Sequence, residues 1–165
     1  MESVMNELLS KISSYNLFNY LLPGVIFAVL AGDLVRYPIL QRDIITGAFL
    51  CYFAGLVVSR FGSLVVEPTL RFFSFLRFAN YDEFVSASKK DEKLELFSEV
   101  NNTYRTLCAL FILLLLLKLY TRVEGEFPFL KDWDSTLLAV LLLVMFLFSY
   151  RKQTAYIAKR IKANG

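Results

Sequence analysis

The sequence contains no histidine among its 165 residues. Histidine is the commonest metal ligand and the commonest general base near neutral pH, so two frequent routes to catalysis are missing. Only two cysteines are present, Cys51 and Cys108, and they form no CxxC pair. We interpret both as packing residues inside apolar segments. With no phosphate-binding glycine loop and no nucleophile elbow either, the sequence predicts a protein that is not an enzyme and has no metal or cofactor.

The excess of positive over negative charge is also small. The net charge is +3, which by itself is too small to predict a nucleic-acid-binding protein. Apolar residues, in contrast, are abundant: the chain is 56% hydrophobic and its mean hydropathy is +0.51. They are gathered into four dense blocks separated by charged segments. This blocking is typical of membrane spans and unlike the periodic pattern of a soluble core.

The four blocks predict an all-α integral membrane protein with four transmembrane helices. A helix of about 20 residues, rising about 1.5 Å per residue, crosses the hydrocarbon core of about 30 Å. The last two blocks have shorter strictly apolar runs, but these are apolar on every face, and flanking residues such as Lys118 and Arg151 can reach the headgroups. We expect one membrane domain over residues 1–165, with spans at about 15–34, 44–66, 104–120 and 135–150, a helical cytoplasmic loop at 67–103 and a basic tail at 151–165.

The distribution of lysine and arginine predicts the orientation. Thirteen of the 18 lie in the N-terminal tail, the loop between spans two and three, and the C-terminal tail. Positive charges are retained on the cytoplasmic side, so both termini and the long middle loop are expected there. Within that loop, residues 69–78 alternate basic and aromatic side chains and predict an interfacial amphipathic helix. Residues 82–102 predict one or two further short helices.

Small residues recur every four positions along the second span. Residues four apart form one inclined ridge on a helix, and small side chains there let another backbone approach closely. We therefore predict a helix–helix seam, either within one subunit or between subunits. Chance is the alternative explanation, because small residues are common in membrane helices. The predicted seam comprises Gly47, Cys51, Gly55, Ser59, Gly62 and Ser63.

Polar residues at the ends of the spans form a second candidate group. Arg60 and Glu67 lie two helical turns apart and would share a face if the helix continues that far. Charge near the membrane is costly, which favours a polar layer joining span two to its neighbours; lipid contact by Arg60 or an ion pathway are the alternatives. Asn16 and Asn19 could bond across helices or cap the first span. The tail residues are interpreted as lipid-docking or partner-docking groups: Arg151, Lys152, Lys159, Arg160 and Lys162.

Three stretches resemble a family of small four-span bacterial membrane proteins that includes the membrane subunit of the Kiwa anti-phage defence system. They are SSYNLFNYLLPGVIF (13–27), VSRFGSLVVEP (58–68) and SEVNNTYRT (98–106), and the resemblance covers about residues 13–150. It implies an oligomeric, by analogy tetrameric, inner-membrane sensor of phage attack with a cytosolic, DNA-interacting effector docked beneath it. It brings no catalytic residues. Onto this sequence it carries structural or coupling roles for Ser59, Arg60, Glu67 and Pro68, and for Asn101, Asn102, Thr103, Tyr104 and Arg105.

The sequence thus favours a homo-oligomeric sensor or scaffold in the bacterial inner membrane that docks and regulates a cytosolic effector. Membrane lipids are expected partners, and direct contact with nucleic acid is not expected. The alternative is a small ion channel or holin-like pore that perturbs the membrane.

Overall fold

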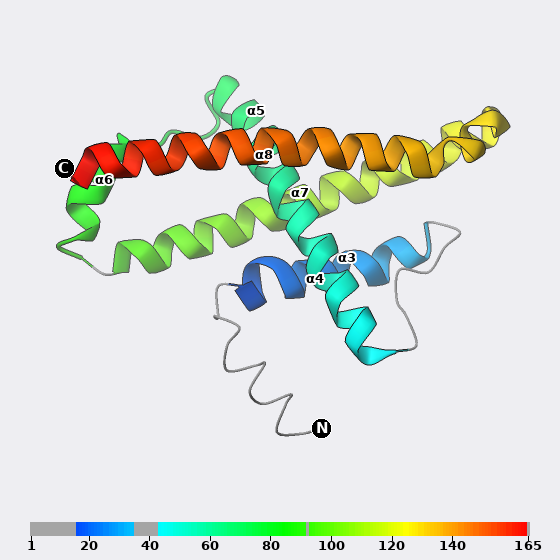
Figure 1. Ribbon diagram of the computed structural model, residues 1–165, viewed down its shortest axis with the longest axis horizontal. Coiled ribbons are helices and arrows are strands. Elements are labelled where there is room, and N and C mark those ends of the chain that lie inside the picture. The colour runs from blue at the N-terminus through cyan, green and yellow to red at the C-terminus, as the bar shows by residue number, and fades with distance from the viewer. Residues whose placement is uncertain (1–15, 35–42, 92, 165) are drawn as a thin grey trace.

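All regular secondary structure in the described part of the chain is helical. The computed structural model describes residues 16–34, 43–91 and 93–164, and no strand occurs within them. In Figure 1 the helix Ile44–Phe61 crosses the long helices Lys93–Glu126 and Asp134–Asn164 obliquely. The elements in chain order are η1 (Leu17–Leu21), α3 (Leu22–Gly32), α4 (Ile44–Phe61), η2 (Gly62–Val66), α5 (Glu67–Phe72), α6 (Tyr81–Ser88), α7 (Lys93–Glu126), η3 (Pro128–Asp132) and α8 (Asp134–Asn164).

Within these residues, three helices are long and apolar enough to cross a membrane: Ile44–Phe72, Lys93–Glu126 and Asp134–Ala163. The all-helical class is therefore confirmed. The first predicted span, 15–34, appears as a shorter apolar helix, Leu17–Gly32. At about 1.5 Å per residue it is roughly 24 Å long, less than the hydrocarbon thickness of about 30 Å. Residues 1–15, which precede it, lie outside the described residues, as does most of the first predicted outer loop.

Two helices extend beyond their predicted boundaries. α7 begins at Lys93, inside the predicted cytoplasmic loop, and α8 continues through the predicted tail to Asn164. The physical reason is local: no proline or glycine interrupts residues 93–124 or 134–164, so nothing removes a backbone hydrogen bond along them. Each apolar span therefore continues into its polar extension as one rigid helix.

The predicted amphipathic helix at 69–78 is wrong, because α5 ends at Phe72. Ser74 adopts φ 57°, in the left-handed region. Its N–H donates to the Arg71 carbonyl, and the Phe75 N–H donates to the Leu70 carbonyl. This pair of bonds is a Schellman motif, which caps a helix and reverses the chain. The basic and aromatic side chains are consequently displayed on a turn.

Both π-helical turns precede a proline. The Leu22 N–H donates to the Leu17 carbonyl, and the Glu67 N–H donates to the Gly62 carbonyl, each across five residues. Pro23 and Pro68 follow directly. A proline ring crowds the carbonyl of the preceding turn and supplies no N–H, and widening the turn relieves that crowding. The helix therefore continues through Pro68.

Two glycines let α3 and α4 cross in direct backbone contact. A methyl group on Gly55 would collide with the carbonyl oxygen of Tyr20, and one on Gly24 would collide with that of Cys51. Farther along, Gly62 faces Ala109 of α7. This part of the seam thus lies within one chain. All six residues of the predicted seam are buried: Gly47, Cys51, Gly55, Ser59, Gly62 and Ser63.

α8 stands apart from the rest. Only 6% of its apolar stretch is buried inside the chain, against 39% for Ile44–Phe72 and 22% for Lys93–Glu126. Large side chains such as Leu141, Leu143 and Phe148 are exposed. Apolar area of this extent is costly in water. Lipid or another protein must cover this helix.

We expect Gly55→Ala to destabilise the protein by about 3 kcal/mol, because the added methyl group would force two helix backbones apart. Gly32→Ala is the matched control: a methyl group there meets nothing within 4 Å, and alanine is the better helix former. Thermal unfolding in detergent micelles measures both. Equal melting temperatures for the two variants would contradict the direct backbone contact.

Candidate functional site

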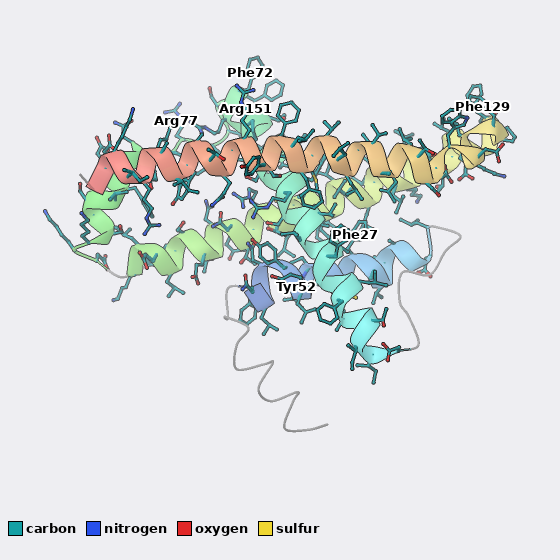
Figure 2. All side chains as sticks on the ribbon, viewed as in Figure 1. Phe27, Tyr52, Phe72, Arg77, Phe129 and Arg151 are labelled. Carbon is teal, nitrogen blue, oxygen red and sulfur yellow. The ribbon has the colours of Figure 1, made fainter. Side chains whose placement is uncertain are left out.

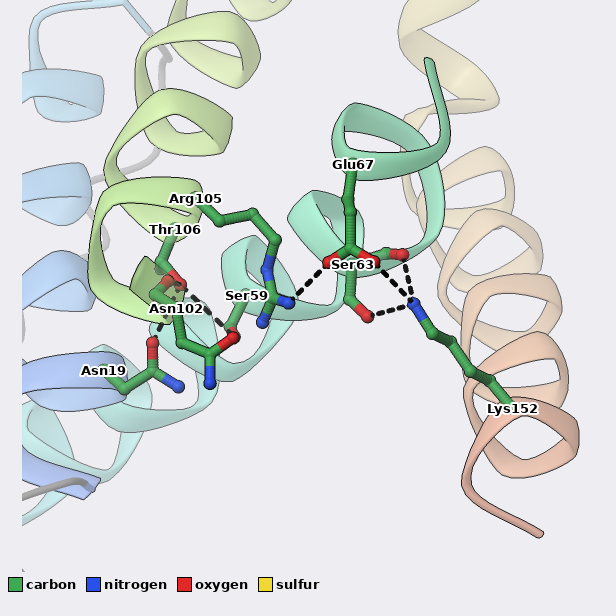
Figure 3. A network of polar contacts seen from close by, with 8 residues as sticks. All are labelled: Asn19, Ser59, Ser63, Glu67, Asn102, Arg105, Thr106 and Lys152. Atoms are coloured by element: carbon green, nitrogen blue, oxygen red, sulfur yellow. Dashed lines mark hydrogen bonds and ion pairs between the residues drawn. The ribbon is translucent and has the colours of Figure 1, made fainter. Parts of the chain in front are cut away.

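Polar side chains from four parts of the chain meet where the apolar helices give way to their polar extensions. Figure 3 shows them as two neighbouring groups. The buried polar layer consists of Asn19, Ser59 and Thr106. The ion cluster consists of Ser63, Glu67, Arg105 and Lys152.

The buried polar layer joins η1, α4 and α7. Thr106 is completely buried, and its hydroxyl lies 2.9 Å from Asn19 Oδ1 and 3.4 Å from Ser59 Oγ. The same hydroxyl lies 2.8 Å from the backbone oxygen of Asn102. A hydroxyl carries one hydrogen, so it donates to one of these oxygens and can accept from the Ser59 hydroxyl. Buried polar groups need such partners, so these bonds fix the positions of η1, α4 and α7 relative to one another.

The ion cluster joins the start of α5 to α7 and α8 through one carboxylate, that of Glu67. Arg105 Nη1 lies 2.8 Å from Glu67 Oε2, and Lys152 Nζ lies 3.8 Å from Glu67 Oε1. The Arg105 and Glu67 side chains are only 20% and 18% exposed. Shielding from water strengthens such a pair relative to a surface ion pair. Glu67 therefore forms ion pairs with both α7 and α8.

Lys152 also binds the backbone of the π-helical turn. Its Nζ donates to the Ser63 carbonyl oxygen at 2.6 Å and to Ser63 Oγ at 2.7 Å. At the five-residue spacing of this turn, the donor to the Ser63 carbonyl would be residue 68. That residue is Pro68, which has no N–H. The ammonium group of α8 thus satisfies a carbonyl that the proline leaves free.

The predicted polar residues of span two have separate partners. Arg60 donates to the Tyr20 hydroxyl at 3.4 Å, whereas Glu67 faces α7 and α8. Each thus contacts a neighbouring helix, although the two do not act on the same one. Of the predicted Asn101–Arg105 stretch, Arg105 joins the ion cluster and Asn102 contributes its backbone carbonyl. Asn101 and Tyr104 are exposed and lie outside both groups.

The five basic tail residues also differ in what they contact. Lys152 reaches the ion cluster, while the others are exposed along α8: Arg151, Lys159, Arg160 and Lys162.

Sequence reasoning missed two members of the site. Thr106 was not singled out, although it is a polar residue at the edge of a long apolar run, next to Arg105. Ser63 was assigned only to the small-residue seam, and nothing in its local sequence indicates a lysine from 89 residues away. Within the described residues, no group of three or more acidic or cysteine side chains could hold a metal ion.

Comparisons with known proteins identify no relative: no family model, no curated protein and no solved structure matches this chain.

We expect Glu67→Gln to lower the stability by about 1–3 kcal/mol, because Arg105 and Lys152 lose their shared counter-charge in a shielded site. For a chain of this size, each kcal/mol of lost stability lowers the melting temperature by roughly 2–4 °C. The measurement is thermal unfolding in detergent micelles. Glu126→Gln removes an exposed carboxylate and should change little. An unchanged melting temperature for Glu67→Gln would show that the cluster does not hold the helices together.

Proposed function

We propose that this chain is a four-span, homo-oligomeric sensor or scaffold of the bacterial inner membrane that docks and regulates a cytosolic effector protein. The observation that carries the proposal is the ion cluster. It ties the end of the second span to α7 and α8 at the level where both continue, unbroken, beyond their apolar stretches. A displacement of one span is thereby passed to two rigid polar extensions.

The polar extensions form one assembled surface, which we call the platform: α6, residues 93–102 of α7 and residues 150–163 of α8. α6 packs on the extension of α8, with the Tyr81 and Tyr156 rings edge-to-face at 5.5 Å. In Figure 1 the platform lies at one end of the molecule, and the turn between α7 and α8 lies at the other. A docking surface for a soluble partner requires such an ordered projection.

Charge supports placing the platform in the cytoplasm. Lys159 and Lys162 are exposed on the α8 extension, and the positive-inside rule puts lysine-rich segments on the cytoplasmic side. The same rule places the α7–α8 turn, at the far end, on the outer side. α3 runs beside α7, and its C-terminal end lies toward the outer end (Figure 1), as a fourth span would. A span of this length is accommodated by a locally thinner bilayer.

Self-association and the defence role have separate support. The apolar face of α8, almost wholly exposed in one chain, offers a surface for contact between copies, and a tetramer is the state that the Kiwa resemblance implies. That resemblance also suggests a response to phage attack and a DNA-interacting effector. The chain itself is proposed to be non-enzymatic, and its soluble partner would do the chemistry.

The test is co-purification in mild detergent after co-expression with the protein encoded by the neighbouring gene. We expect an oligomer that retains the soluble protein. The double variant Lys159→Glu/Lys162→Glu reverses charge on the platform and should reduce the retained partner at least tenfold while leaving the oligomer intact. Lys131→Glu, in the α7–α8 turn at the opposite end, is the matched control and should retain the partner.

Two results would overturn the proposal. One is recovery of a monomer with no bound protein under every condition tried. The other is membrane leakage to small dyes on expression of this chain alone, abolished by Arg60→Gln, which would favour the pore alternative.

A further inference from the structure

A cavity of about 390 Å³ lies beside the ion cluster, between α5 and α8. Its volume is within the range of small-ligand sites. Lys152 reaches from α8 toward Ser63 and Glu67 (Figure 3), and all three residues line the cavity. The remaining lining comes from Leu64, Pro68 and Arg71. The lining is therefore partly apolar and partly charged.

The charges around this cavity do not balance. Of the charged residues that line it, Arg71 and Lys152 are cations and Glu67 is a carboxylate. Arg105, which binds the same carboxylate, adds a third positive charge. Glu67 is already shared between Arg105 and Lys152. The surplus favours an additional anion at this place.

Two of the cations can contact such an anion. The Lys152 side chain is 46% exposed, so its ammonium can be reached from the cavity while it binds Ser63. The guanidinium of Arg71 lies 5.3 Å above the Phe78 ring. This cation–π contact holds the group in place without using its N–H donors. Among the described residues, Arg71 has no carboxylate partner.

The surroundings of Arg71 indicate what carries the anion. Phe72, Phe73 and Phe75, on the Schellman turn next to it, are 84%, 71% and 77% exposed. Aromatic side chains beside basic ones, displayed on a surface, are typical of the membrane–water interface. The turn also directly follows the apolar helical stretch Ile44–Phe72. An anion here would thus lie at the depth of lipid headgroups, with apolar rings available to the chains below.

We propose that this cavity binds the headgroup of an anionic phospholipid, with the phosphate held by Arg71 and Lys152 and the acyl chains beside the exposed phenylalanines. The inference rests on the membrane placement in the proposed function and is independent of any effector. The phosphate oxygens would compete with Glu67 for Lys152. The charge of the lipid would in that way affect the contact between Lys152 of α8 and Glu67 of α5.

The test is native mass spectrometry of the purified full chain in detergent, titrated with phosphatidylglycerol or phosphatidylcholine. We expect one phosphatidylglycerol molecule to bind at least tenfold more tightly than phosphatidylcholine. Arg71→Gln should weaken phosphatidylglycerol binding about fivefold, the effect of one basic residue at an anionic lipid surface. Lys131→Gln removes the same charge from an exposed position in the α7–α8 turn, at the opposite end of the molecule, and should leave binding unchanged.

Each other outcome is decisive. Equal affinity for the two lipids, or equal weakening by Arg71→Gln and Lys131→Gln, would overturn the site. Displacement of bound phosphatidylglycerol by millimolar inorganic phosphate would show that the site takes a free anion and not a lipid. Arg71→Lys preserves the charge and should restore most of the binding, which separates loss of the site from misfolding. Because no partner protein is present, failure here leaves effector docking untouched, and failure of effector docking leaves the lipid site standing.

Discussion

The arrangement of the long helices depends on a hydrogen bond that one residue cannot make. Pro68 has no N–H, so the Ser63 carbonyl lacks its backbone donor within an otherwise continuous helix. In an apolar environment an unpaired carbonyl is costly, and water is not available to satisfy it. The ammonium group of Lys152 takes the place of the missing donor. A local backbone defect thereby becomes a specific attachment point for α8, a helix with few other contacts to the chain.

A second constraint acts on the opposite side of α4. The direct contact of Gly24 and Gly55 brings η1 close enough for Asn19 to reach the Thr106 hydroxyl. Close approach of the backbones and pairing of buried polar groups are therefore two parts of one arrangement. The buried polar layer and the ion cluster together join the continuous helix α4–η2–α5 to η1, α7 and α8. This oblique helix therefore contacts each of those three elements.

This connection is the structural basis of the relay that we propose between the spans and the platform. α7 and α8 are each a single helix from the apolar region into the platform, and Glu67 contacts both near the point of transition. A helix transmits a tilt or a rotation along its length with little loss. An event that alters the charge near Lys152, such as a change in the lipid beside it, would be communicated to the platform without large rearrangements in the core.

The sequence by itself determined the helical class, the apolar blocks and the small-residue ridge of the second span. Each of these follows from short-range patterns: hydrophobic density, the absence of helix breakers and a period of four residues. Helix ends were less predictable, because the end of α5 at Phe72 depends on Ser74 adopting the left-handed region. Only the tertiary structure decided that Glu67 faces Arg105 and Lys152 and not Arg60, that Gly24 is the partner of Gly55, and that Thr106 completes the polar layer. These pairs are separated by 31–87 residues. Their choice depends on how the helices cross, which no local pattern encodes.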